Sequence, residues 1–145
     1  MKLIRTLLAG AAIALCLASV AQADAWSENY DAAVAQAKAS HKTVLLDFTG
    51  SDWCVWCHRI DKEVFAQQAF KDFADKNLIL VKVDFPREHP QDASVKAQNE
   101  KLKQKYAIEG YPTLIAIDGN GKILFTQTGY EPGGADPFIA KFPKS

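Results

Sequence analysis

Methionine, cysteine and net charge are all scarce in this sequence. The 145 residues contain one methionine, Met1, and three cysteines, and 17 basic side chains balance 17 acidic ones. Binding to nucleic acid or to an anionic membrane surface needs a clustered basic excess, so neither partner is expected. Internal repeats, linkers and low-complexity segments are also lacking after residue 23, and the length fits one domain of ordinary size.

Residues 1–23 have the pattern of a secretory signal peptide. Lys2 and Arg5 precede a charge-free, mostly apolar run of about 18 residues that ends in a small-x-small cleavage site at 21–23. An uncleaved membrane anchor is the alternative, because this run just reaches the length that spans a bilayer. We expect cleavage and a mature domain at 24–145, located in the periplasm or secreted, without stable membrane association.

Two cysteines remain in the mature domain, in the stretch Cys54-Val55-Trp56-Cys57. Exported compartments favour disulfides, but a disulfide across three positions closes too small a loop to stabilise a fold much. We therefore expect reactive rather than structural cysteines. Adding His58 also completes C-x-x-C-H, the attachment signature of c-type haem.

Strand signals occur at four places along the chain. Apolar runs with β-branched residues at 43–48 and 78–85 indicate strands buried on both faces of a sheet. Two further runs at 113–118 and 122–126 flank D-G and N-G pairs, the strongest short-range signal of a hairpin.

Helix signals alternate with these strands. Apolar residues at helical spacing indicate helices at 26–40, from Cys54 to a break near 66–67, after that break, and at 93–106. Asp136 is expected to cap a short final helix. The predicted fold class is α/β, with a mixed central sheet, helices on both faces and a C-terminal antiparallel hairpin.

These motifs together resemble the thioredoxin-like superfamily over about residues 27–142. An acid in the first strand precedes W-C-x-x-C at a helix start, and the sequence Gly-Tyr-Pro-Thr at 110–113 follows about 55 residues later, directly before the hairpin. The likeness is to small exported thioredoxin-like proteins and to the C-terminal domain of the membrane disulfide interchange reductase. The segment between the acid and the dithiol is one residue longer than in common thioredoxins.

The resemblance implies an exported thiol:disulfide oxidoreductase that exchanges disulfides with protein substrates, as a reductase or in interchange. A redox partner protein would donate electrons, and no cofactor is expected. A dimerisation domain of the isomerase type is not evident, so we expect a monomer.

Cys54 is predicted to attack and Cys57 to resolve. The start of a helix directs free N–H groups and the positive end of the helix dipole at the Cys54 sulfur, which favours the thiolate. Attack on a partner disulfide gives a mixed disulfide, which Cys57, one helical turn later, can break.

Asp47 and Lys82 are predicted to assist this chemistry. Burial in a strand raises the pKa of an acid and suits it to proton transfer. The resemblance implies that Asp47 deprotonates the resolving cysteine, with Lys82 as its neighbour in the next strand. Local pairing at the strand end is the alternative for Asp47.

Substrate contacts are expected at Trp53, Trp56, Tyr111 and Pro112. The resemblance implies a cis peptide bond before Pro112 and pairing of an extended substrate with the backbone of residue 111. Trp53 would offer an apolar docking surface, and the Trp56 ring would lie beside the sulfurs. Core packing for Trp53 and an ordinary trans proline are the alternatives.

Three other functions use the same residues. Haem would need His58 as one axial ligand and His41 or His89 as the other, but the surrounding strands already build a packed sheet. Cys54, Cys57 and His58 could hold copper(I) or zinc in a metal carrier, although a second cysteine pair is missing. The third is a binding module without redox turnover, against which the retention of both cysteines argues.

Overall fold

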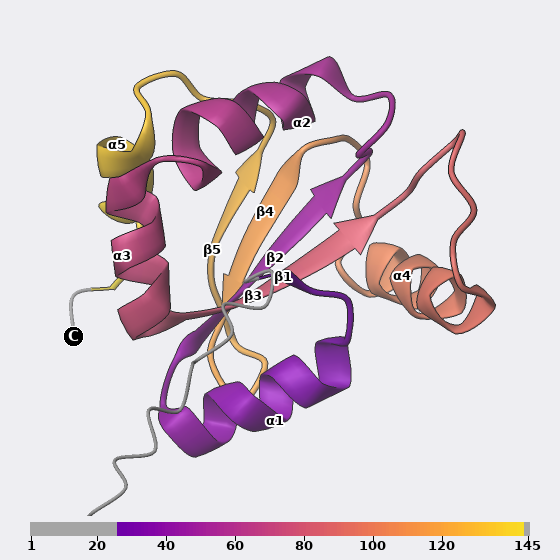
Figure 1. The fold of residues 1–145 in the computed structure, drawn as a ribbon. Helices are drawn as coiled ribbons and strands as arrows, with labels where there is room; N and C mark the ends of the chain where they lie inside the picture. The colour runs from indigo at the N-terminus through magenta and orange to yellow at the C-terminus, as the bar shows by residue number, and fades with distance from the viewer. Residues whose placement is uncertain (1–25, 144–145) are drawn as a thin grey trace, which may run out of the picture.

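A five-stranded mixed sheet forms the centre of residues 26–143, the part of the chain that the computed structural model describes (Figure 1). The strands run in the order β1-β3-β2-β4-β5. Their bounds are β1 (Trp26–Ser27), β2 (Thr43–Thr49), β3 (Leu78–Asp84), β4 (Thr113–Ile117) and β5 (Ile123–Thr128). Pairing is parallel from β1 through β3 to β2 and antiparallel from β2 through β4 to β5. The predicted mixed sheet and C-terminal hairpin are confirmed.

Helices cover both faces of this sheet, as predicted. They are α1 (Tyr30–Ser40), α2 (Val55–Ile60), the π-helical turn η1 (Asp61–Phe65), α3 (Gln68–Asn77), α4 (Ala93–Lys105) and α5 (Ala135–Ile139). One hydrophobic core lies between the sheet and α2, η1, α3 and α5, and the other lies between the sheet and α1 and α4 (Figure 1). The predicted break near 66–67 is also confirmed, because η1 ends at Ala66 and α3 is capped by Gln67.

Two predicted helix starts are wrong. The helix expected over 26–40 begins only at Tyr30, because Trp26 and Ser27 pair with the edge of β3 and the Asn29 side chain caps the helix by accepting the N–H of Ala32. Asp136 lies within the first turn of α5 rather than at its cap, which is Gly134.

The central strand β2 carries side chains into both cores. Val44, Leu46 and Phe48 face α1 and α4, whereas Leu45 faces α2 and η1. Alternation along a strand therefore turns Asp47 toward the face covered by α2. The C-terminal end of β2 leads into the dithiol, and its pairing with the start of β4 brings Pro112 to the same end of the sheet.

No helix within residues 26–143 is both long and apolar enough to cross a bilayer. The predicted signal peptide, residues 1–23, lies outside the described residues.

Candidate active site

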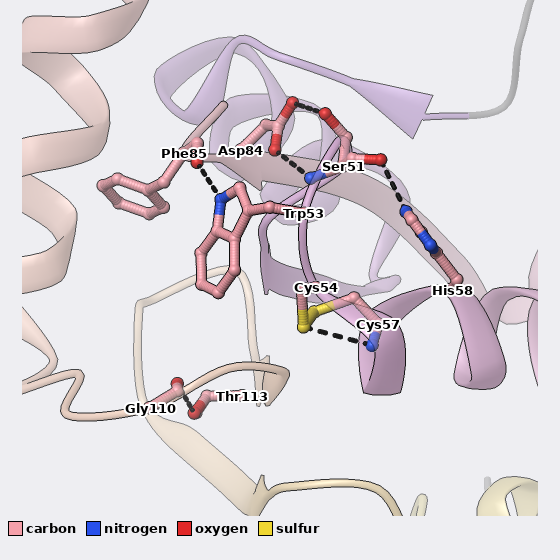
Figure 2. Close-up of a disulfide and its surroundings, with 9 residues drawn as sticks. All are labelled: Ser51, Trp53, Cys54, Cys57, His58, Asp84, Phe85, Gly110 and Thr113. Atoms are coloured by element: carbon pink, nitrogen blue, oxygen red, sulfur yellow. Dashed lines mark hydrogen bonds between the residues drawn. A yellow bond between two sulfur atoms is a disulfide. The ribbon is translucent and has the colours of Figure 1, made fainter. Parts of the chain in front are cut away.

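Cys54 and Cys57 are joined by a disulfide at the start of α2, with Cα atoms 5.2 Å apart (Figure 2). Cys54 is the N-cap residue, and its Sγ accepts a hydrogen bond from the N–H of Cys57 at 3.2 Å. Cys54 is 5% exposed and Cys57 is 1% exposed. An approaching partner therefore reaches Cys54 first.

The turn between β2 and α2 is built around Gly50. Its carbonyl oxygen accepts hydrogen bonds from the N–H groups of Trp53 and Cys54, at 3.3 and 2.9 Å. A Cβ atom at Gly50 would lie 2.3 Å from Cε2 of Trp53. Only glycine therefore lets the indole ring fold back against the turn beside the cysteine.

The longer segment before the dithiol is fastened to the end of β3 and to the chain that follows it. The Ser51 N–H donates to Asp84 at 2.9 Å, and its hydroxyl donates to the same carboxylate (Figure 2). The Asp52 carboxylate accepts three successive N–H groups from residues 87–89. These bonds, the one from Arg87 most of all, lower the pKa of Asp52. The extra residue is thus held in an anchored turn.

Trp53 joins this turn to the loop that precedes β4. Its Nε1 donates to the carbonyl of Phe85 at 2.8 Å (Figure 2). The ring meets that of Tyr111 edge to face, with centroids 5.6 Å apart. The Cζ atom of the Arg87 guanidinium lies 3.8 Å from the centre of the Trp53 ring. The Tyr111–Pro112 peptide bond is cis, which confirms the predicted cis bond before Pro112.

Trp56, between the cysteines, is 53% exposed and stacks on Tyr130, with centroids 5.7 Å apart. The Arg59 guanidinium lies 4.8 Å from the Tyr130 ring centre and 5.7 Å from that of Trp56. Glu63 accepts hydrogen bonds from Arg59, at 2.8 Å, and from the Tyr130 hydroxyl. The four side chains form the Trp56–Tyr130 cluster, which ties α2 and η1 to the loop after β5.

An open groove of about 410 Å³ runs beside this cluster. Its lining residues are Trp56, Arg59, Tyr111, Gly129, Tyr130 and Pro132. Two of the four predicted substrate contacts, Trp56 and Tyr111, therefore share one groove. Sequence reasoning missed Arg59 and Tyr130, because they lie far apart along the chain and only the fold brings them together.

The predicted acid, Asp47, is buried, and within residues 26–143 neither of its carboxylate oxygens has a hydrogen-bond partner. Its pKa is raised to about 8, mainly by burial and further by the nearby Asp61 carboxylate, while the Lys82 ammonium acts in the opposite direction. The predicted rise is confirmed. The alternative, in which Asp47 pairs locally at the strand end, is not supported, because within residues 26–143 the carboxylate has no hydrogen-bond partner.

Asp61 is a second acid near the dithiol that sequence reasoning missed. It begins η1, one turn after Cys57, and its N–H donates to the Cys57 carbonyl. It is half-buried, and burial raises its pKa as well. The spacing of four residues from Cys57 places both on one helix face, which is the signal that could have identified it.

His58 turns away from the sulfurs (Figure 2). Its Nε2 donates to the carbonyl oxygen of Ser51 at 2.7 Å. Residues 26–143 hold no group of three or more His, Cys, Asp or Glu side chains arranged to bind a metal ion. The geometry thus gives no support to a metal centre made of Cys54, Cys57 and His58.

The sheet, the capped dithiol and the cis-proline loop together define the class of thioredoxin-fold proteins. The chain belongs to the thioredoxin-like domain family, whose model matches residues 30–139. This confirms both the fold and the family resemblance.

Comparison with individual relatives indicates which activity within this class the chain has. A disulfide bond reductase of Chlamydia pneumoniae, DsbH, is 38% identical over 122 residues, covering 84% of this chain and 73% of that protein. A solved structure of a DsbH oxidoreductase has a TM-score of 0.75 and 39% identity, over 80% of this chain and 79% of that one. The thiol:disulfide interchange protein DsbD of Photorhabdus laumondii is 31% identical over 83 residues, which are 57% of this chain and 13% of that protein. With the Cys54–Cys57 pair in place, this chain is a protein-disulfide oxidoreductase.

Replacing Asp47 with Asn should give a protein whose stability exceeds that of the wild type by an amount that grows as the pH rises. The folded chain keeps Asp47 protonated up to about pH 8, whereas the unfolded chain ionises it near 3.8. The wild-type protein therefore loses free energy of unfolding between these pH values, by several kcal/mol at about 1.4 kcal/mol per pKa unit. Denaturant unfolding of both proteins, at intervals from about pH 4 to 8, measures the difference. A difference that stays constant across this range would contradict the buried, protonated acid.

Proposed function

We propose that the protein is an exported reductase or interchange protein that passes electrons from a redox partner protein to disulfides in protein substrates. This proposal rests mainly on the Cys54–Cys57 disulfide at a helix N-cap, in which Cys54 is the more exposed residue. The name of one relative, a disulfide bond reductase, supports this direction of electron flow, and the name of another, an interchange protein, supports disulfide exchange. The signal-peptide pattern of residues 1–23 supports export to the periplasm. A monomeric state is part of the same proposal.

The reduced protein reacts in two exchange steps. In the first, the Cys54 thiolate attacks a substrate disulfide. The substrate S–S bond breaks, a bond between Cys54 and the substrate forms, and one substrate sulfur leaves as a thiolate. In the second, the Cys57 thiolate attacks Cys54, which closes the disulfide and releases the other substrate sulfur. The substrate gains two electrons and two protons, and the redox partner then reduces the Cys54–Cys57 disulfide with two electrons, with uptake of two protons, which restores the dithiol.

Asp47, in the ionised fraction of about a tenth that a pKa of about 8 leaves at pH 7, takes the proton from Cys57 before the second step. Cys57 is 1% exposed, so a base inside the protein has an advantage over bulk water. Asp47 is buried on the sheet face that α2 covers, and a pKa of about 8 lets it exchange a proton near neutral pH. Lys82, the register partner of Asp47 in β3, contributes the positive charge that lowers the pKa of Asp47. Asp61 provides a half-buried carboxyl between this interior and the surface.

Substrate binding uses the surface around Cys54. An extended segment lies along the backbone at Tyr111 and Pro112, and the groove beside Trp56 takes the neighbouring substrate side chains. Trp53 borders the same approach through its contact with Tyr111. Exposed aromatic rings that are held rigid by their neighbours contribute strongly to protein association.

Serine substitutions should separate the two steps. Cys54→Ser should abolish reduction of insulin, because the attacking thiolate is gone. Cys57→Ser should instead accumulate a mixed disulfide through Cys54, visible as a higher-mass band that a reducing agent removes. His58→Gln is the matched control and should retain most activity, because glutamine can still donate toward Ser51. Full insulin reduction by Cys54→Ser would overturn the proposed function.

Tyr130→Ala should weaken the binding of protein substrates but not the reaction with small disulfides. Loss of the ring opens the groove and frees Trp56 and Arg59, so KM for a protein disulfide should rise about tenfold, equivalent to about 1.4 kcal/mol. The rate with a small aromatic disulfide should change little, because attack by Cys54 does not need the groove. Ile123→Ala, an exposed residue on β5 outside the groove, is the control. An unchanged KM for Tyr130→Ala would show that substrates do not dock here.

A further inference from the structure

Lys82 lies opposite the buried acid but does not pair with it. Asp47 and Lys82 are register partners in the parallel pair β2–β3, so both side chains leave the sheet on the α2 face. Within residues 26–143 no hydrogen bond or ion pair joins them, and both Asp47 oxygens lack a partner. The Lys82 Nζ lies instead 5.7 Å from the centre of the Trp26 ring.

Trp26 is fixed at this position from three sides. It lies in the edge strand β1, opposite Leu80 of β3, and Leu80 shares a sheet face with Lys82. Its ring packs on Phe65 of η1, with centroids 4.9 Å apart, and joins the margin of the core beneath α2. The indole face that meets the ammonium is thus held by a strand pair and by an aromatic neighbour.

We propose that Trp26 is a positioning residue that holds the Lys82 ammonium toward the sheet edge and so leaves Asp47 without a counter-ion. A cation over an indole face is attracted by the ring quadrupole, most strongly where water is partly excluded. Lysine is a point charge on a flexible four-carbon stem, so without this attraction it can swing toward the carboxyl beside it. The proposal rests on the proposed function, in which Asp47 exchanges a proton with Cys57.

The other charges around Asp47 act in the opposite direction from Lys82. Asp61 of η1 and Asp84 of β3 both raise the pKa of Asp47, and Lys82 alone lowers it. The facing residue of β4 is the apolar Leu114. The distance between Lys82 and Asp47 is therefore the adjustable quantity, and Trp26 is the side chain that sets it. A protonated Asp47 at neutral pH follows from this arrangement.

The test is the titration of the Asp47 carboxyl carbon by NMR in the mature protein. Trp26→Leu keeps an apolar side chain but removes the ring face, so the Asp47 midpoint should fall by about one to three pH units as Lys82 approaches. Trp26→Phe keeps a ring and should stay close to the wild type. The same Trp26→Leu change in a Lys82→Met background should produce no fall, because no ammonium is left to move.

Two results would overturn the positioning role. One is an unchanged Asp47 midpoint in Trp26→Leu, and the other is an equal fall with and without Lys82. Because the titration does not depend on turnover, it separates this proposal from the proposed function. Insulin reduction that survives in Asp47→Asn would remove the catalytic role of Asp47, whereas the Trp26 result would stand.

Discussion

The structure is organised around one buried carboxyl, that of Asp47, which has no hydrogen-bond partner within residues 26–143. Asp47 lies in the central strand, and burying it in ionised form is costly where no hydrogen bond compensates the charge. It therefore stays protonated until about pH 8. Everything close to it is consistent with this constraint: two further acids, an apolar neighbour in β4 and a lysine whose charge faces Trp26.

The dithiol is presented by the same strand. Where β2 ends, the turn at Gly50 and the anchors at Ser51 and Asp52 bring Cys54 to the cap of α2. Cys57 is 1% exposed and lies on the same side of the sheet as Asp47, whereas Cys54 is 5% exposed and is the more accessible of the two. One strand thus places the proposed proton acceptor within the protein and leads into the proposed nucleophile at the start of α2.

Much of this arrangement could be predicted from the sequence, because the signals were local. The strands at β2 and β3, the hairpin, the dithiol at a helix start and the burial of Asp47 each follow from short patterns of apolar residues or from one motif. The cis bond before Pro112 came from the family resemblance. Strand β1 was not predicted, since two residues carry no periodicity and pair only because the edge of β3 is free.

The surroundings of the site were harder to predict because they depend on tertiary contacts. The Trp56–Tyr130 cluster joins α2, η1 and the loop after β5, and no local pattern links these segments. The same is true of Lys82 and Trp26, which meet only through the sheet order. Asp61 is the exception, since its helical spacing from Cys57 was visible in the sequence.

The most direct test of the account is the redox potential of the Cys54–Cys57 pair, measured by equilibrating the mature protein in glutathione buffers. A protein that delivers electrons to substrate disulfides should have a midpoint near that of thioredoxin, about −270 mV. A midpoint near about −120 mV, the value of a strong oxidant such as DsbA, would contradict it.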